Sequence, residues 1–599
     1  MLKEFENGTV KLSDGIFKER ENTNRNYLLE LKNKNLLQNF YLQAGVPLEN
    51  AGILNDLNNV DMHFGWESTS CQLRGHFLGH WLSAASMLYA TYKDNELLNR
   101  INQIINELEH LQELNGGKWI GSIPESYLKR LEGTEYIWSP QYTMHKTVMG
   151  LYHTYIYTGN EKAYKILSNL ADWYIDWVEF EQENCPEAIY RGEHGGMLEM
   201  WASLYDTTKD EKYLKLAEAY SKEWTFEQLI KDIDCLSNTH ANASIPLAHG
   251  ACKMYEITND EKYLKIALNF WKHAVTERGY FCTGGNNAGE FWIPKQMFGN
   301  FVSDRDQEFC TTYNMVRLAQ YLYKFTGKSE YADYIELNLY NGFLAQQNKN
   351  TGTPDYFLSL ITGSKKEWGS KTRDFWCCHG TMVQAQTIYA KLCYALSEDE
   401  NTVFVNQYIP SKLNSNNIKI NQYIDMKFYD TQSFFEQTAK TNTSRWQIKF
   451  EVNSNNKDIQ IAFRIPQWCN NEPLILLNGG KIKLDIKDNY VLINRKWNND
   501  CVEIIFNPSV RAVPLPGDET LVAFMEGPIV LAGLTDEDCG IKFSENNMTD
   551  SFKQLSEHIY SSFSWKQSNY ITKNQVKNIT FKPLYEIQDE TYTVYFTKK

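Results

Sequence analysis

The sequence lacks the usual features of proteins that bind nucleic acid or span a membrane. Lys and Arg total 60 against 74 Asp and Glu, which leaves a net charge of −14. Nucleic acids and anionic membrane surfaces attract clustered positive charge, so neither is an expected partner. The longest apolar stretches fall far short of the ~18–20 residues that a membrane-spanning helix needs.

The start of the chain also lacks a basic segment followed by an apolar run. No secretory signal is therefore expected, and the predicted location is the cytoplasm. Thiols stay reduced there, so the 12 cysteines are better interpreted as metal ligands or catalytic groups than as disulfides. Nine of them precede residue 400, as do 11 of the 12 histidines, which places the predicted chemistry in the first two-thirds of the chain.

A repeated polar segment divides this first part of the chain. Residues 208–215 (TKDEKYLK) recur almost unchanged at 258–265, and looser copies lie near Thr91, Thr158, Thr326 and Ser397. The period near 50 residues is typical of helix pairs that stack into solenoids or toroids. Six pairs predict a closed (α/α)6 barrel over residues 21–400, with an open solenoid as the alternative.

Two sets of helices are expected within the barrel. The outer set is predicted at 25–43, 95–115, 160–178, 210–227, 260–275 and 329–348. The inner set is predicted at 75–90, 141–157, 194–206, 241–257, 310–325 and 379–396.

After residue 400 the apolar residues alternate with polar ones, which is typical of short antiparallel strands. We expect a β-sandwich over 401–516, followed by a second sandwich or a continuation of the first over 517–599. Residues 1–20 form an N-terminal segment that could add a strand to this β region.

Ionisable residues collect at the predicted starts of the inner helices. In chain order they are His76 and His80, His145, His194, His240, Glu308 with Cys310, and Cys377-Cys378-His379. In a toroid these starts ring one face, where the helix dipoles favour thiolates and carboxylates. A shared functional site on that face is therefore predicted.

Glu308, Cys310, Cys377 and Cys378 supply three thiols and a carboxylate, a donor set that suits zinc; buried structural cysteines are the alternative. His76 and His80 have the spacing of a metal-binding helix face but lack the Glu that follows the first His in zinc proteases. We therefore interpret them as pocket wall or core.

A loop rich in Gly and Asn, residues 282–292, precedes the helix of Cys310 and carries Glu290. A long loop on the face of the site is a natural carrier of a catalytic acid. An exposed loop glutamate without a catalytic role is the alternative.

Segments throughout the chain together resemble glycoside hydrolase family 127, the β-L-arabinofuranosidase family. They are Arg74-Gly-His-Phe-Leu-Gly-His80, Tyr142-Thr-Met-His145-Lys, Glu193-His-Gly-Gly-Met197, Thr283-Gly-Gly285 to Gly289-Glu290, Glu308-Phe-Cys310 to Tyr313-Asn-Met315, Phe375-Trp-Cys-Cys-His-Gly-Thr381, Arg464-Ile-Pro-Gln-Trp468 and Glu526-Gly-Pro528. The family fold that this resemblance implies is an (α/α)6 barrel followed by β-sandwich domains.

The resemblance also implies a set of site residues. It implies a zinc ion on Glu308, Cys310, Cys377 and Cys378, with Cys377 as the nucleophile and Glu290 as the acid/base. His145, His194 and His240 match positions that hold the sugar, and Tyr356 matches a pocket tyrosine. Ser359-Leu360 stands where the family leads us to expect Pro-Leu after that tyrosine.

The expected function is that of a retaining exo-glycosidase. It would remove non-reducing-end β-L-arabinofuranosyl, or closely related furanosyl, residues from an oligosaccharide or glycoconjugate. The oligomeric state stays open, with a homodimer as one option.

Two other functions are considered. A uronyl hydrolase or lyase on the same toroid would need basic residues for carboxylates, and the segments at the pocket edge contain only Arg74, Lys146 and Arg191. A non-catalytic, zinc-containing sugar-binding protein would keep the cysteines but would not need Glu290.

Overall fold

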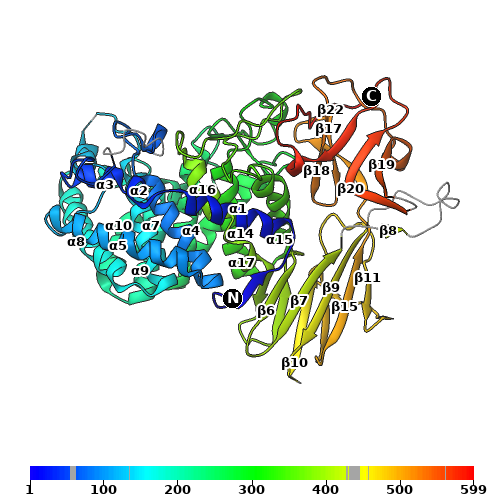
Figure 1. The fold of residues 1–599 in the computed structure, drawn as a ribbon, viewed down its shortest axis with the longest axis horizontal. Helices are drawn as coiled ribbons and strands as arrows, with labels where there is room; N and C mark the ends of the chain where they lie inside the picture. Colours follow the sequence, from blue (N-terminus) through cyan, green and yellow to red (C-terminus); the bar gives the residue numbers. More distant parts are fainter. Residues whose placement is uncertain (54–61, 134, 426–428, 431–444, 456, 560–561) are drawn as a thin grey trace.

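The structure is a computed structural model that describes residues 1–53, 62–133, 135–425, 429–430, 445–455, 457–559 and 562–599. A helical body holds the N-terminal two-thirds of the chain, and two β regions, yellow and orange to red in Figure 1, lie beside it. Among the described residues, no helix combines the length and apolarity that crossing a membrane requires.

Six inner helices form the wall of the helical body. They are α4 (His76–Tyr92), α7 (Pro140–Thr158), α9 (Met197–Thr208), α12 (Ala241–Thr258), α14 (Phe309–Thr326) and α16 (Cys377–Ala385). Each contacts the next along the chain, and α16 contacts α4. The ring is therefore closed, which confirms the (α/α)6 barrel and excludes the open solenoid.

Outer helices surround this ring. They are α1 (Ile16–Glu30), α5 (Asn95–Leu114), α8 (Glu161–Asn184), α10 (Glu211–Tyr220), α13 (Glu261–Trp271) and α15 (Ser329–Asn338). Each has an apolar face that is buried against the barrel; α5, for example, buries Leu97, Ile101, Ile104 and Leu108.

The repeated polar segment is the turn that links an inner helix to the next outer helix. In the two matching copies, Lys209 and Asn259 adopt left-handed backbone conformations and end α9 and α12. Asp210 and Asp260 then accept hydrogen bonds from the backbone N–H groups of the next helices. The repeat is thus explained by helix-capping chemistry.

Three predicted helices are broken, so their predicted extents were wrong. In place of the inner helix over 379–396, α16 ends at Ala385, α17 (Tyr389–Cys393) follows, and residues 394–396 form strand β4. The other two are outer helices. In place of one helix over 25–43, α1 ends at Glu30 and a short helix, α3 (Gln38–Gln43), follows. In place of one helix over 210–227, α10 ends at Tyr220 and α11 (Trp224–Ile230) begins anew, because Glu223 accepts a hydrogen bond from Thr225 N and caps it.

The first β region is a sandwich of two sheets. One follows the order β1 (Val10–Leu12), β6 (Ser411–Asn414), β7 (Lys419–Asp425), β9 (Trp446–Asn453), β15 (Asp500–Phe506), β11 (Leu474–Leu477), β12 (Gly480–Lys481). The other follows β13 (Ile486–Lys487), β14 (Tyr490–Lys496), β10 (Asp458–Arg464), β5 (Thr402–Val405), β4 (Tyr394–Leu396). The rings of Phe450 in β9 and Phe463 in β10 lie 4.9 Å apart, so the sheets pack face to face.

The N-terminal strand β1 pairs with β6 and so joins this sandwich. Strand pairing in the sandwich is antiparallel except between β10 and β5, which are parallel.

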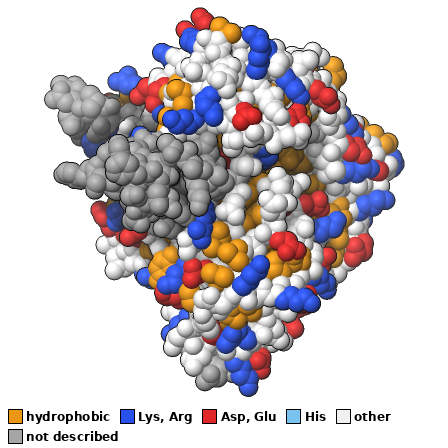
Figure 2. Space-filling view, turned by 90° about the vertical axis from the view of Figure 1, so that its right-hand side faces the viewer, with side chains coloured by type: hydrophobic (Ala, Val, Ile, Leu, Met, Phe, Trp, Pro, Cys, Tyr) orange, Lys and Arg blue, Asp and Glu red, His pale blue; other side chains and the backbone are white. Residues whose placement is uncertain are grey.

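The second β region is built on one eight-stranded sheet. Its order is β16 (Val510–Leu515), β17 (Asp518–Glu526), β18 (Ile529–Gly533), β21 (Thr580–Pro583), β20 (Ser562–Thr572), β19 (Phe552–Ile559), with β22 (Phe596–Thr597) on β17 and β8 (Tyr429–Asp430) on β20. Gly517 forms the turn of the β16–β17 hairpin at φ +82°. The boundary expected between 516 and 517 was misplaced, because both strands of this hairpin belong to the second sheet and the division lies between Phe506 and Val510. On the face of the molecule shown in Figure 2, positive and negative side chains are interspersed.

Two of the C-terminal motifs fasten the β regions to the barrel. The buried guanidinium of Arg464 pairs with Asp333 and Glu336 of α15, and Trp468 Nε1 donates to Glu336 Oε2 at 2.8 Å. Asn341 donates to the Pro528 carbonyl at 2.7 Å. These contacts hold α15, the outer helix that follows α14 in the chain. The first turn of α14 carries Cys310.

Candidate active site

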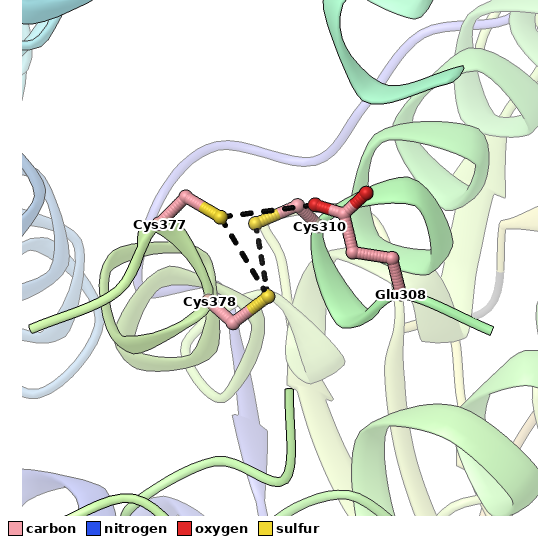
Figure 3. A group of neighbouring side chains, drawn as sticks. All are labelled: Glu308, Cys310, Cys377 and Cys378. Carbon is pink, nitrogen blue, oxygen red and sulfur yellow. Dashed lines mark hydrogen bonds between the residues drawn. The ribbon is translucent and has the colours of Figure 1, made fainter. Parts of the chain in front are cut away.

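A buried cluster of four donor residues lies at the start of α14 and α16 (Figure 3). The ligand atoms of Glu308, Cys310, Cys377 and Cys378 all lie within 4.8 Å of one another. Cys310 Sγ is 3.3 Å from Cys378 Sγ, and Cys377 Sγ is 3.7 Å from Glu308 Oε1. The structure therefore brings together all four residues of the predicted zinc set.

The helix starts explain how these side chains meet. Glu308 is the residue before α14, and its neighbour Phe309 donates a backbone hydrogen bond to the Tyr356 carbonyl. Cys377 and Cys378 form the first turn of α16, which Trp376 precedes, and Phe375 before it adopts a left-handed conformation at φ +47°. Because α14 and α16 are neighbours in the ring, the two starts face one another.

The directions in which the pKa values of the four donors shift indicate that the cluster suits a cation. Burial raises the pKa of Glu308, Cys310 and Cys378 well above their usual values. Burial also opposes ionisation of Cys377, but hydrogen bonds from Cys310, Cys378 and Tyr356 to its sulfur outweigh that effect and lower its pKa. Four donors converge, and three of them resist ionisation; a bound cation would compensate this arrangement, so the set fits a metal ion.

Glu290 lies in the tight turn between β2 (Asn287–Ala288) and β3 (Phe291–Trp292), close to the cluster. The hydroxyl of Tyr356 donates to Glu290 Oε1 at 2.7 Å, and the same hydroxyl is 3.4 Å from Cys377 Sγ. Burial and the charge of Cys377 raise the pKa of Tyr356, so it remains a hydrogen-bond donor. One tyrosine therefore contacts both Glu290 and Cys377.

Tyr356 contacts one carboxylate oxygen of Glu290, and His240 lies near the other. It precedes α12, and its Nε2 lies 3.9 Å from Glu290 Oε2 while its Nδ1 lies 3.5 Å from Glu193 Oε1. Burial opposes the charge of His240, but Glu193 and Glu290 outweigh it and raise its pKa. Glu193 adopts a left-handed backbone conformation at φ +59°, which is uncommon for a residue with a side chain.

His145 and His194 lie on the same ring of helix starts but make other contacts. His145 is buried against Gly196, and none of the described residues bonds to its Nε2. His194 Nε2 lies 3.2 Å from Glu223 Oε2, and its ring packs against Tyr190 and Tyr220. Among the described residues, neither histidine forms a hydrogen bond or an ion pair with a member of the cluster.

The structure also adds residues that the sequence analysis left without a role. Tyr142 donates its hydroxyl to His76 Nδ1 at 3.2 Å, and His76 Nε2 bonds at 2.8 Å to the carbonyl of Phe375, two residues before Cys377. Burial lowers the pKa of His76 to about 4, so it is a neutral part of the wall. Tyr142 and His76 both belong to motifs named above. The sequence alone did not show that these two motifs contact one another.

Ser359, where the sequence departs from the expected Pro, points away from the cluster. Its hydroxyl pairs with Ser364 Oγ at 2.5 Å, and its carbonyl accepts from Tyr592 at 2.7 Å. Ser359 in place of the expected Pro therefore affects the hydrogen bonds that hold the segment after Tyr356, and Tyr356 itself keeps its position.

Family models match most of the chain. Residues 9–391 match the catalytic domain of the GH127 β-L-arabinofuranosidases, and residues 402–507 match their middle domain. The chain belongs to glycoside hydrolase family 127. This family 127 protein is thus a glycoside hydrolase, and its fold and its cluster agree with that placement.

Relatives of this family 127 protein share its architecture at low sequence identity. A non-reducing end β-L-arabinofuranosidase of Bifidobacterium longum subsp. longum is 20% identical over 526 residues, covering 75% of this chain and 74% of that protein. A solved GH127 β-arabinofuranosidase superposes with a TM-score of 0.73 at 18% identity, covering 100% of this chain and 98% of the other. A GH127 β-L-arabinofuranosidase from Geobacillus stearothermophilus T6 gives 0.72 at 16% identity, covering 98% and 100%. These likenesses establish the fold.

Proposed function

We propose that this protein is a retaining exo-glycosidase in which Cys377 is the nucleophile and Glu290 the acid/base. The observation that carries the proposal is the shared contact with Tyr356, at 3.4 Å from Cys377 Sγ and 2.7 Å from Glu290 Oε1. The sulfur and that oxygen can be no farther apart than the sum of these distances, about 6 Å. Catalytic groups are roughly 5–5.5 Å apart in retaining glycosidases and about 6.5–9.5 Å in inverting ones, so the spacing favours retention.

Each residue then has a defined part in two displacement steps. Cys377 Sγ attacks the anomeric carbon while Glu290 gives its proton to the departing oxygen, which forms a thioglycoside. In the second step Glu290 takes a proton from water, the water oxygen bonds to the anomeric carbon, and the C–S bond breaks. Tyr356 keeps the two groups aligned, and His240 supports Glu290 from the other side.

We propose zinc as the ion held by Glu308, Cys310, Cys377 and Cys378. Three sulfurs and one carboxylate oxygen form a soft, four-donor set of the kind that selects zinc. Bound there, zinc would keep the thiols ionised. All 12 cysteines are unpaired, which is in keeping with a reducing, cytoplasmic location.

The proposed substrate is a non-reducing-end β-L-arabinofuranosyl, or closely related furanosyl, unit of an oligosaccharide or glycoconjugate. The names of the relatives and the family model support this sugar. His145, His194 and His240 are the proposed sugar-holding residues, with Tyr356 beside them. The uronate alternative loses support because Arg74 and Arg191 already donate to the carbonyls of Cys71 and Leu131.

The deciding experiment is hydrolysis of an aryl β-L-arabinofuranoside, with the first-formed anomer followed by NMR and zinc measured in the same preparation. A β-anomer product and bound zinc are expected. An α-anomer product would refute retention. Cleavage of an unsaturated uronide in place of the arabinofuranoside would favour the alternative enzyme class, and tight sugar binding without turnover would favour the binding protein.

A further inference from the structure

Lys146 is a cation near the start of the inner helix α7 for which the described residues supply no acidic partner. It follows His145 on the inner helix α7, and its ammonium lies 4.5 Å from the centre of the Tyr142 ring. Because the residues are four apart in one helix, they share a face. Within the described ranges, Lys146 Nζ has neither a carboxylate partner nor a hydrogen-bond acceptor.

The position of Lys146 relative to the cluster follows from its contact with Tyr142. The Tyr142 hydroxyl donates to His76 Nδ1 at 3.2 Å, and His76 Nε2 bonds at 2.8 Å to the carbonyl of Phe375, two residues before Cys377. The ring that Lys146 packs against is therefore joined by hydrogen bonds to the start of α16, on the side of the barrel where a sugar would meet Cys377.

The backbone around Lys146 is fixed by close helix packing. A Cβ on Gly79 of α4 would come within 1.9 Å of the Lys146 carbonyl oxygen, so α4 and α7 touch there without a side chain between them. Helix α7 therefore fixes the position of the Lys146 Cα. The Lys146 side chain packs against the Tyr142 ring.

Three other cations on the inner helices are paired with acidic residues, which makes the state of Lys146 informative. Arg317 pairs with Glu199 at 2.5 Å, and Lys324 pairs with Glu256 at 2.6 Å. Lys253 contacts both Asp206 and Glu256. Burial lowers the pKa of Lys146 to about 8, as expected for an ammonium that has lost water without gaining an acceptor.

We propose that Lys146 donates hydrogen bonds to hydroxyl oxygens of the furanosyl unit at the nucleophile, and so determines which sugars the pocket accepts. This proposal rests on the proposed function. An ammonium has three donors and no acceptor, so it requires ligand oxygens. A neutral sugar suits the site better than a uronate, since Glu193, Glu290 and Glu308 already line the same space.

Lys391 offers a matched control on the same barrel. Its ammonium lies 4.7 Å from the centre of the Tyr157 ring, close to the corresponding 4.5 Å for Lys146, but it donates to the Tyr157 hydroxyl at 2.8 Å. Tyr157 is in the last turn of α7, whereas Tyr142 is in the first, so Lys391 lies away from the helix starts. Lys391→Met should therefore leave sugar binding as in the unchanged protein.

The test compares Lys146→Met, Lys146→Gln and Lys391→Met in the zinc-loaded enzyme. The probes are aryl β-L-arabinofuranoside and its 2-deoxy and 3-deoxy analogues. Losing a hydrogen bond from a charged donor should raise KM of Lys146→Met for the parent sugar roughly 10- to 100-fold, with a smaller change in kcat. Lys146→Gln should recover part of that loss, and one deoxy analogue should be equally poor with and without the lysine.

Several outcomes would overturn the proposal. An unchanged KM in Lys146→Met would show that Lys146 does not bind the sugar. Zinc loss in step with activity would show that the ammonium serves the cluster. Tight binding of a uronate that needs Lys146 would replace the hydroxyl ligand with a carboxylate. If the unchanged enzyme does not cleave the arabinofuranoside at all, the proposed function fails separately from the role of Lys146.

Discussion

Tyr356 and Glu290 are joined by a 2.7 Å hydrogen bond that brings the loop glutamate to the cysteine cluster. The tyrosine is contributed by the segment before α16, and the glutamate by the turn between β2 and β3. Without this bond, Glu290 would depend on His240, whose Nε2 is 3.9 Å away. The alignment of the proposed acid with the proposed nucleophile therefore depends on Tyr356, which in this proposal neither gives nor takes the transferred proton.

Replacing Tyr356 by Phe tests this dependence. The variant removes only the hydroxyl, so the fold and the metal content should be unchanged. A hydrogen bond to a charged group contributes about 1.5–3 kcal/mol, and kcat/KM should therefore fall roughly 10- to 100-fold. Steady-state kinetics with zinc analysis of the same sample measures both. A variant with unchanged kcat/KM would show that Glu290 is held by other groups.

Removing one metal ligand should remove the metal. Cys310→Ser is expected to lose zinc and activity together, because Cys310 is fully buried and its sulfur is 3.3 Å from Cys378 Sγ. Elemental analysis of reduced protein should find about one zinc per chain before the change and little after it. Cys501→Ser, which changes a partly exposed cysteine of β15, is the control and should keep the metal. Full activity in the metal-free variant would refute a catalytic metal site.

Glu290→Gln should have effects that depend on the leaving group. General acid catalysis is commonly worth about 10²–10⁴-fold, and a poor leaving group needs it most. Activity on an alkyl or sugar β-L-arabinofuranoside should therefore fall far more than activity on a nitrophenyl one. A series of aryl substrates of graded acidity measures the trend. Equal losses across the series would assign Glu290 to holding the loop.

The nucleophile can be identified by covalent labelling. Cys377 lies 3.4 Å from the Tyr356 hydroxyl, whereas the Sγ of Cys378 faces the Tyr356 carbonyl at 3.9 Å. An epoxide or haloacetamide analogue of L-arabinofuranose should therefore label Cys377, and peptide mass spectrometry should locate the label. A label on Cys378 or on a carboxylate would contradict the assignment.

Glu193→Gln should destabilise the protein in acid more than in base. Glu193 and Glu290 raise the folded-state pKa of His240, so its protonation stabilises the fold below the ordinary histidine pKa of about 6.5. That stabilisation disappears as the pH rises through the folded pKa. The variant should therefore lose up to about 1 kcal/mol of unfolding free energy near pH 5.5 and little near pH 8.5.

Urea unfolding at both pH values measures this effect. The same change made in a His240→Asn background should show no such pH dependence, because the titrating partner is gone. A loss of equal size at both pH values would mean that Glu193 stabilises the fold through its backbone turn alone.

Much of the barrel could be predicted because its signals are local. The polar turns at 208–215 and 258–265 carry helix caps that depend on a few adjacent residues, so the repeat marked the helix ends well. The breaks after Glu30 and Tyr220 were missed because the apolar pattern continues across them. The parallel pairing of β10 with β5 has no local signature and depends on how distant strands assemble.

The candidate site divides in the same way. Glu308, Cys310, Cys377 and Cys378 could be grouped from the sequence because their residue types share one chemistry. The contact of His240 with Glu193 joins two helix starts, and only the closed ring defines their distance. The sequence also cannot show that the described residues give Lys146 no acidic partner, because this depends on which side chains lie near its ammonium in the folded protein.

The closed ring also sets an order of events during synthesis. Glu308 and Cys310 leave the ribosome early enough to fold with the first five inner helices, but Cys377 and Cys378 belong to the last inner helix, which contacts the first. A nascent chain therefore exposes an incomplete set of thiols until α16 closes the barrel. The proposed metal site and the closed ring would then be completed together, and a chain truncated before α16 would have neither.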